Sequence, residues 1–291
     1  MHQSFGAPLL YAGRIARRER IKQKKTFYKL PLKKTTRVKR LYITNIIIYL
    51  LLIIIYLLSK NIYIFNLIYS LFITLSFFIV YLSNIINIPV EKLVFIYYKN
   101  NALKKLNSYN NLEVVGITGS YGKTSSKNIL NEILNVKYNP LPTPENYNTQ
   151  YGLIITINNY LDKFNDIFIA EMGAFKQGRI KLLCDLVKPK YGIITSIGTA
   201  HLETFGSREN IMKGKFELIE SLPTNGLAIL NMDDEYQVKY KIKNTCKVKW
   251  ISIDNPKADI IANDIKIDSS GMDFNVFFKN ENINYRFQTK L

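Results

Sequence analysis

The chain has 291 residues, a formal net charge of +18 at pH 7 and only two cysteines. This length allows one large domain or two small ones. Cys184 and Cys246 form no CxxC pair and have no histidine nearby in sequence, which argues against a disulfide framework or a cysteine metal site and favours a reducing compartment.

The positive charge is concentrated near the N-terminus. Residues 14–40 contain thirteen Lys or Arg and a single acid, Glu19, whereas residues 91–291 carry 26 basic and 21 acidic side chains. We expect residues 1–40 to form a basic arm that orients a membrane protein, attracts anionic lipid headgroups or binds nucleic acid. The third role is disfavoured, because apolar sequence adjoins the arm and no nucleic-acid-binding motif accompanies it.

Two uncharged apolar stretches follow at 41–59 and 61–90, separated by Lys60. Each has the roughly 20 residues that a bilayer core requires, and neither has a polar face. We expect a hairpin of two transmembrane helices over 41–90, in which Asn45 and Asn66 can hydrogen-bond across the pair. The basic arm would then place the N-terminus in the cytoplasm, and two spans return the chain there. Buried helices of a soluble protein or a signal peptide are the alternatives, and both fit the sequence less well.

Residues 91–111 are expected to be a linker, and from residue 112 expected strands alternate with expected helices. This alternation predicts an α/β fold built on a mostly parallel sheet. The expected strands are 113–118, 166–171, 191–197, 226–232 and 247–253, the expected helices are 123–134 and 207–221, and β-hairpins are expected over 258–267, 272–279 and 283–289.

A glycine-containing loop joins the first expected strand to the first expected helix. In this order, backbone N–H groups and the helix N-terminus point towards one anion. We therefore predict an ATP phosphate site, with Lys123 against the β- and γ-phosphates and the Thr124 hydroxyl as a ligand of Mg²⁺. The loop lacks the first glycine of the general GxxxxGK[ST] pattern, because Ile117 stands at that position. Its residues are Thr118, Gly119, Ser120, Tyr121, Gly122, Lys123, Thr124 and Ser125.

Five more segments carry side chains suited to the same chemistry. Glu171 ends an expected strand in Ile169-Ala170-Glu171-Met172-Gly173-Ala174, and a carboxylate at the carboxyl end of a parallel strand points into the ligand crevice. The other four segments are Thr143-Pro144-Glu145-Asn146-Tyr147-Asn148-Thr149, Thr195-Ser196-Ile197-Gly198-Thr199-Ala200-His201-Leu202-Glu203, Lys213-Gly214-Lys215-Phe216-Glu217-Leu218 and Asn231-Met232-Asp233-Asp234. Taken singly, the first also fits a turn, the second a structural histidine and the third a solvated helix lysine.

The order of these motifs resembles the central ATPase domain of the Mur ligase family, the peptidoglycan-precursor ligases and their relatives, over about residues 112–290. The resemblance implies a P-loop-containing sheet domain that uses ATP and Mg²⁺. It assigns Asn148 to the γ-phosphate or acyl-phosphate, Glu171 to Mg²⁺, His201 to a second Mg²⁺, Lys215 (with Lys213 as runner-up) to a carbamylated lysine that helps to hold that second ion, Asn231 to the adenine and Asp234 to the nucleotide.

The resemblance also implies the reaction, an ATP-dependent joining of a carboxylate to an amine through an acyl-phosphate, with Lys123, Asn148, His201 and Lys215 as catalytic residues. The Gly-Ala after Glu171 and the A-H-L-E-x-F-G string are similar to the subgroup that adds D-alanyl-D-alanine to a UDP-N-acetylmuramoyl tripeptide, including clostridial-type members with a membrane hairpin. We expect location at the plasma membrane, a cytoplasmic catalytic domain, lipids bound by the hairpin and arm, a UDP-muramoyl peptide and an amine or dipeptide as substrates, and no nucleic acid.

The expected domain plan is a basic arm (1–40), a hairpin (41–90), a linker (91–111) and the central ATP-binding domain (112–291). Because neither the family's usual UDP-binding domain nor its C-terminal domain is expected in this plan, the sequence suggests a truncated form and leaves UDP recognition and turnover open. Two alternatives remain. One is a non-catalytic, membrane-tethered nucleotide-binding protein; the other is a different P-loop NTPase or kinase, in which His201 and Lys215 have no metal role.

Overall fold

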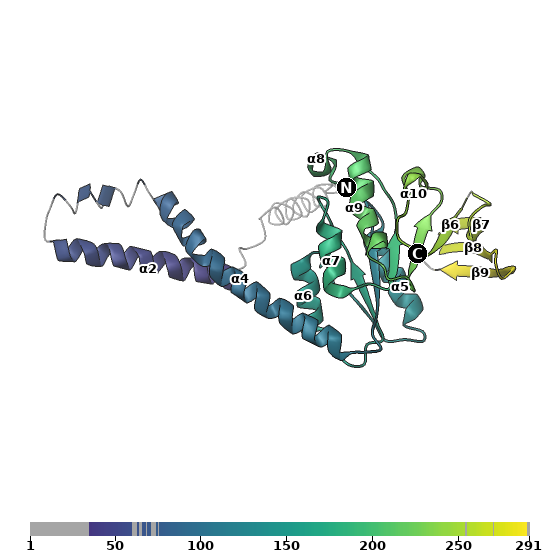
Figure 1. Ribbon diagram of the computed structural model, residues 1–291, viewed down its shortest axis with the longest axis horizontal. Coiled ribbons are helices and arrows are strands. Elements are labelled where there is room, and N and C mark those ends of the chain that lie inside the picture. The colour runs from purple at the N-terminus through teal and green to yellow at the C-terminus, as the bar shows by residue number, and fades with distance from the viewer. Residues whose placement is uncertain are drawn as a thin grey trace, which may run out of the picture. The chain divides into compact units, whose positions relative to one another are not determined.

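The computed structural model describes residues 35–59, 63, 66, 67, 69, 70, 74, 76–253, 255–269 and 271–289 (Figure 1). The chain divides into two compact units, Met1–Val94 and Phe95–Leu291. Most of the predicted basic arm and much of the sequence between 60 and 75 lie outside the described residues, so those predictions remain predictions.

The first unit contains helix α2, Thr36–Ser59, and the beginning of helix α4, Ser76–Ser108. Both helices are long and apolar enough to cross a membrane, with mean hydropathies of 2.6 and 1.5. None of the apolar window of α2 is buried by the described chain, which is unlike a core helix of a soluble protein. This exposed apolar surface needs an apolar environment or a partner to cover it.

Polar side chains connect α2 to α4. The predicted bond of Asn45 across the pair exists, but its partner is Ser83, whose hydroxyl donates to Asn45 Oδ1 over 3.0 Å. Asn66 is exposed. Two further contacts make this a ladder of three: Asn87 Nδ2 donates to Thr44 Oγ1 over 2.9 Å, and the Arg40 guanidinium pairs with Glu91 at 2.6 Å.

The predicted linker is mostly helical, because α4 continues through residues 91–108. The reason is visible in its side chains: Ala102 is fully buried, and Phe95, Leu103 and Leu106 pack against the core of the second unit. These positions recur at helical spacing and give this end of α4 an apolar face. Residues 91–108 are therefore helical, and their role as a linker remains a prediction.

The second unit is built on a nine-stranded sheet with the order β2-β3-β1-β4-β5-β6-β7-β8-β9. Pairs from β2 to β7 are parallel, and β7, β8 and β9 form an antiparallel end. This confirms the predicted α/β fold with a mostly parallel sheet. The strands are β1 (Glu113–Thr118), β2 (Pro140–Pro142), β3 (Ile167–Glu171), β4 (Tyr191–Ile194), β5 (Leu227–Asn231), β6 (Lys247–Ser252), β7 (Ile260–Asp268), β8 (Gly271–Phe278) and β9 (Ile283–Thr289).

Helices cover both faces of this sheet, and alternate residues of each strand face opposite ways. Val114 in β1 and Phe168 in β3 join the large core under α6, α7 and α9, whereas Val115 and Ile117 join a smaller core under α5. Figure 1 shows α6, α7 and α9 together on one side of the sheet. The helices are α5 (Lys123–Leu134), α6 (Gln150–Asn159), α7 (Arg179–Val187), α8 (Leu202–Phe205), α9 (Arg208–Glu220) and α10 (Glu235–Lys239).

Replacing a ring in the large core tests this packing. Phe168 is 0% exposed and Phe164 is 67% exposed, so the two rings offer a matched pair four residues apart. Phe168→Ala is expected to lower the free energy of unfolding by about 3–5 kcal/mol, because it leaves a cavity. Phe164→Ala should change it by less than about 0.5 kcal/mol. Urea unfolding of the detergent-purified chain, followed through its single tryptophan, Trp250, measures both; equal losses would contradict the assigned core.

Candidate active site

The predicted phosphate loop lies between β1 and α5, and two glycines give it its shape. Gly119 has a φ of 154° and Gly122 a φ of 80°, which side-chain-bearing residues rarely adopt. A Cβ on Gly119 would lie 1.9 Å from the hydroxyl oxygen of Thr195. The loop therefore needs glycine at position 119 both for its backbone angle and for its contact with the segment after β4.

The segment after β4 also holds the loop by hydrogen bonds. The Ser120 N–H donates to the Ser196 carbonyl over 2.8 Å, and the Thr195 hydroxyl donates to the Tyr121 carbonyl over 2.6 Å. The sequence predicted that this strand continues to Ile197. These bonds explain why β4 ends at Ile194 instead. The Ser120 hydroxyl oxygen is buried and has no hydrogen-bond partner within the described chain, so it is available to a ligand.

The remaining loop residues differ in their exposure. The hydroxyl of Thr118 is buried and donates to the Met172 carbonyl over 2.9 Å, which fixes the end of β1 beside the end of β3. Tyr121 and Ser125 are exposed. Lys123 folds back over the loop, and its ammonium donates to the Gly119 carbonyl over 2.7 Å. Burial lowers the pKa of Lys123, although the nearby charge of Glu171 acts in the opposite direction.

Glu171 brings three segments together at the carboxyl end of β3. The carboxylate is 2% exposed. Its Oε2 accepts a hydrogen bond from the Thr124 hydroxyl over 3.0 Å, and its Oε1 accepts one from Asn148 Nδ2 over 3.2 Å. Asn148 can approach because residue 173 is glycine: a Cβ there would lie 2.8 Å from the Asn148 amide. The predicted residues Thr124, Asn148 and Glu171 thus form one cluster beside the loop.

Lys127 is the member of this cluster that sequence reasoning missed. Its ammonium lies 3.2 Å from Glu171 Oε2 and donates to the Glu145 carbonyl over 2.8 Å, and its side chain is only 3% exposed. It stands one helical turn after Lys123 on α5, and this i, i+4 spacing was the available signal. A buried carboxylate requires a compensating charge, and Lys127 supplies it.

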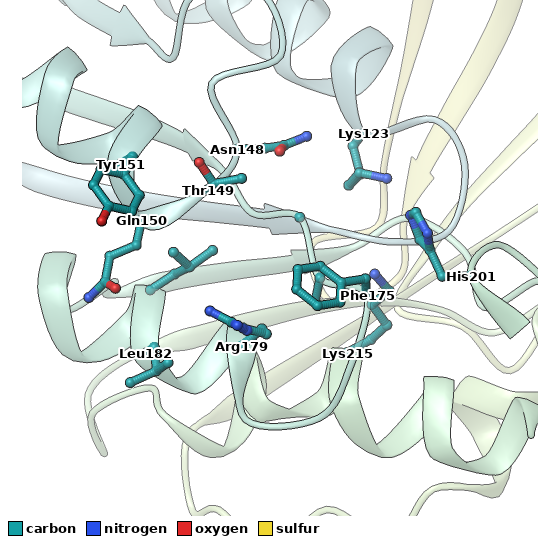
Figure 2. A pocket seen from close by; sticks show the side chains of 13 residues that line it. Lys123, Asn148, Thr149, Gln150, Tyr151, Phe175, Arg179, Leu182, His201 and Lys215 are labelled. Atoms are coloured by element: carbon teal, nitrogen blue, oxygen red, sulfur yellow. The ribbon is translucent and has the colours of Figure 1, made fainter. Parts of the chain in front are cut away.

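Lys215 and His201 line the same pocket as Lys123 and Asn148 (Figure 2). Lys215 is 2% exposed, and its amine makes no hydrogen bond or ion pair with the described residues. Burial, followed by the positive charge of Lys123, lowers the pKa of Lys215 to about 8, and Glu217 opposes this shift. Lys213, the runner-up, is exposed. His201 is exposed and adopts a left-handed backbone with a φ of 63°.

The pocket has a volume of about 460 Å³. It contains all four side chains that the sequence predicted to be catalytic, although they come from four separate segments. Its lining residues are Lys123, Asn148, Thr149, Gln150, Tyr151, Gly173, Ala174, Phe175, Arg179, Leu182, Leu183, His201 and Lys215.

Asn231 and Asp234 do not line this pocket. The Asp234 carboxylate caps α10, and it accepts a hydrogen bond from the Ile197 N–H over 2.7 Å. The Asn231 side chain accepts from the Asp233 N–H over 3.0 Å in a turn after β5. Both residues therefore have structural roles at the carboxyl ends of neighbouring strands, and a contact with a nucleotide remains a prediction.

The donor set around the loop suits one divalent metal ion. Mg²⁺ is bound in proteins by one or two carboxylates, hydroxyls and substrate phosphates, and Thr124 and Glu171 are such ligands side by side. The described residues contain no group of three or more His, Cys, Asp or Glu able to hold a metal ion. A second metal ion near His201 would not be held by Lys215 as an ammonium, because an ammonium is a cation and has no lone pair to offer. Lys215 could be a ligand of that ion as a carbamate, which is an anion.

Comparison with known proteins identifies the domain. Residues 117–291 match the family model described as the Mur ligase middle domain. The UDP-N-acetylmuramoyl-tripeptide–D-alanyl-D-alanine ligase of Escherichia coli (strain K12) is 34% identical over 162 residues, which are 55% of this chain and 36% of the relative. That of Mycobacterium leprae is 39% identical over 123 residues, 42% of this chain and 24% of the relative.

Solved structures agree with the family match. The crystal structure of MurF ligase from Thermotoga maritima in complex with ADP has a TM-score of 0.60 and 29% identity, covering 67% of this chain and 44% of that one. MurF from Acinetobacter baumannii has a TM-score of 0.61, and at 24% identity it supports the fold alone. The present chain thus spans less than half the length of the relatives it matches.

The ion pair of Lys127 and Glu171 gives a stability prediction. Lys127→Met should lower the free energy of unfolding by about 3–5 kcal/mol, because it leaves a buried carboxylate without its cation. Adding Glu171→Gln to this variant should recover much of the loss, since the second change removes the stranded charge. Urea unfolding of the two single variants and the double variant measures the coupling. Strictly additive losses would show that the pair does not act as one unit.

Lys215 predicts a pH dependence of stability. Its folded-state pKa is about 8, below the value of about 10.4 for an unfolded lysine, so between these pH values the unfolded chain holds more protons. The stability of the natural chain relative to Lys215→Met should therefore rise from pH 8 to pH 10.4. Below pH 8 the variant should be more stable by up to a few kcal/mol, at about 1.4 kcal/mol per pKa unit. Unfolding in CO₂-free buffer measures this, and a pH-independent difference would contradict the buried position.

Proposed function

The chain belongs to the Mur ligase family, and from this membership we propose that it is an ATP-dependent carboxylate–amine ligase of peptidoglycan precursor synthesis. One observation carries the proposal: the pocket gathers Lys123, Asn148, His201 and Lys215 beside the glycine loop and the Thr124–Glu171 pair. Such an arrangement can hold a triphosphate and a carboxylate close together, although both are anions.

The proposed reaction has two steps. The γ-phosphoryl group of ATP moves to a carboxylate oxygen of the acyl substrate, which gives an acyl-phosphate and ADP. An amine then attacks the acyl carbon, forms the amide bond, loses a proton and expels inorganic phosphate. The relatives' names supply the substrates of the proposal, a UDP-N-acetylmuramoyl tripeptide and D-alanyl-D-alanine.

The chain's own residues take the following roles in this proposal. The N–H groups of the 119–123 loop and the ammonium of Lys123 bind the β- and γ-phosphates, and Lys123 leaves its Gly119 carbonyl partner to do so. Thr124 and Glu171 would hold Mg²⁺, which when bound neutralises phosphate charge. Asn148, already oriented by Glu171, presents its amide towards the group that is transferred.

Lys215 is the proposed site of carbamylation. The ammonium first loses a proton; the neutral amine then attacks CO₂, a C–N bond forms and a second proton leaves the nitrogen, so that a cation becomes an anionic carbamate. Burial favours this step, because a pKa of about 8 leaves a substantial neutral fraction near physiological pH. The product, together with His201, would supply oxygen and nitrogen ligands for a second Mg²⁺.

The first unit is proposed to anchor the domain to the plasma membrane, with the catalytic domain in the cytoplasm. Two long apolar helices and the unburied apolar surface of α2 support this location. The ladder from Arg40 to Ser83 would satisfy polar groups between the helices, as a bilayer requires. The basic arm would attract anionic headgroups, at about 1 kcal/mol for each basic residue near the surface.

Bicarbonate separates the two candidate lysines. With ¹³C-bicarbonate, the natural chain and Lys213→Ala should both show a carbamate carbon signal by NMR, and Lys215→Ala should show none. ADP release with the muramoyl tripeptide and D-alanyl-D-alanine should fall by about 10²–10³-fold in Lys215→Ala and should not respond to bicarbonate.

Lys213→Ala is the matched control, because Lys213 lies two positions from Lys215 and is exposed. A carbamate signal that survives in Lys215→Ala would contradict the assignment. ADP release that does not depend on the muramoyl peptide would contradict the ligase proposal itself.

A further inference from the structure

Arg179 is a charged residue of the pocket that the proposed chemistry leaves without a role. It is the first residue of α7 and lines the pocket with Lys123 and Lys215. Its guanidinium makes no hydrogen bond or ion pair with any described residue, and its Nε is buried without a partner. Its guanidinium carbon lies 5.0 Å from the centre of the Phe175 ring.

The charge of the pocket is one-sided. Lys123 and Arg179 contribute cations, Lys215 adds a third as long as it is a protonated amine, and none of the described residues in the lining is Asp or Glu. Glu217, on α9, forms no ion pair with Arg179 among the described residues; its two carboxylate oxygens accept hydrogen bonds from the Gly178 and Lys181 N–H groups over 2.5 and 2.9 Å. This contact occupies the N-terminus of α7 and fixes the point from which Arg179 extends.

We propose that Arg179 binds a free carboxylate of the acyl substrate and is a specificity-determining residue of the site. The inference rests on the proposed function, since the loop and Lys123 are assigned to the phosphates and the anion at Arg179 must then belong to the other substrate. A guanidinium matches a planar carboxylate with two parallel hydrogen bonds, and the pairing is stronger where water is excluded.

The surroundings of Arg179 fit a peptide-like ligand rather than a bare ion. Figure 2 shows Arg179 next to Phe175 and Leu182, with Gln150 and Tyr151 on the other wall and Lys215 beyond the Phe175 ring. Aromatic and aliphatic walls bind the organic body of a ligand, and Arg179 fixes the position of its charge. The Phe175 ring, 5.0 Å from the guanidinium carbon, makes a favourable cation–π contact with Arg179.

Binding to the full 291-residue chain in detergent tests this proposal, with Mg·ADP and the UDP-N-acetylmuramoyl tripeptide titrated in parallel. Arg179→Gln should weaken binding of the tripeptide about tenfold or more and leave Mg·ADP within about twofold. Arg179→Lys should recover part of the lost affinity, because lysine keeps the positive charge but lacks the two parallel N–H donors of the guanidinium. Lys181→Gln is the matched control: it removes a cation from the same helix, and that cation pairs with Asp185 instead of lining the pocket.

A ligand variant makes the test specific for a carboxylate. Amidating each free carboxylate of the tripeptide in turn should identify one whose loss weakens binding to the natural chain as much as Arg179→Gln does. The variant should be insensitive to that same amidation, because the interaction has already been lost.

Four outcomes would overturn the inference. The losses of tripeptide affinity caused by Arg179→Gln and by amidation could be additive, or Arg179→Gln could weaken the binding of Mg·ADP as much as that of the tripeptide. Lys181→Gln could weaken tripeptide binding as much as Arg179→Gln does, or the natural chain could bind Mg·ADP but no tripeptide. A chain that binds the tripeptide through Arg179 but fails to bind Mg·ADP would instead contradict the proposed function and leave the inference standing.

Discussion

The site depends on one buried carboxylate. Glu171 ends β3 at 2% exposure, in surroundings where an unpaired negative charge is costly. Its compensation comes from the Thr124 hydroxyl, the Asn148 amide and the Lys127 ammonium, which belong to two separate segments of the chain. Satisfying this one charge therefore fixes the position of α5 and the segment before α6 against the end of the central strand pair. The phosphate loop runs directly into α5, so the position of α5 also fixes that of the loop.

The same carboxylate gives the site two alternative electrostatic states. Without a metal ion, Lys127 and Thr124 satisfy Glu171, and Lys123 turns back onto its own loop. With Mg·ATP bound in the proposed manner, Glu171 would face the positive charge of the metal ion as well as that of Lys127. Lys123 would then face the negative charge of the triphosphate. The fold keeps Lys123 and Arg179, with Lys215 as a third cation while its amine is protonated, in one pocket without an Asp or Glu in its described lining, an arrangement that favours anionic ligands.

Local patterns predicted most of the framework. The strand, glycine loop and helix over 113–134 were predicted with their final boundaries, and the position of Glu171 followed from its place at a strand end. The short helix α6 was missed because most of its residues are apolar and buried: Leu153, Ile154 and Ile157 read as an apolar run rather than as a periodic pattern. The short helix α7 was also missed, although Lys181 and Asp185 form a polar side on it. The helical continuation of α4 was missed because its apolar face becomes apparent only beside the core that it covers.

The residues of the candidate site could be predicted only where they belong to a recognisable sequence motif. Lys127 and Arg179 belong to no motif, and their importance depends on what the fold places opposite them: a buried carboxylate for Lys127, and an acid-free pocket for Arg179. The choice of Lys215 over Lys213 likewise rested on resemblance until the burial of the two side chains could be compared.

The most direct test of the central claim is an experimental structure of the chain with Mg·ADP. We predict that the β-phosphate lies against the backbone N–H groups of residues 119–123 and that a metal ion is bound to both Thr124 Oγ1 and the Glu171 carboxylate. A nucleotide bound elsewhere, or a metal ion that leaves Glu171 paired only with Lys127, would contradict it.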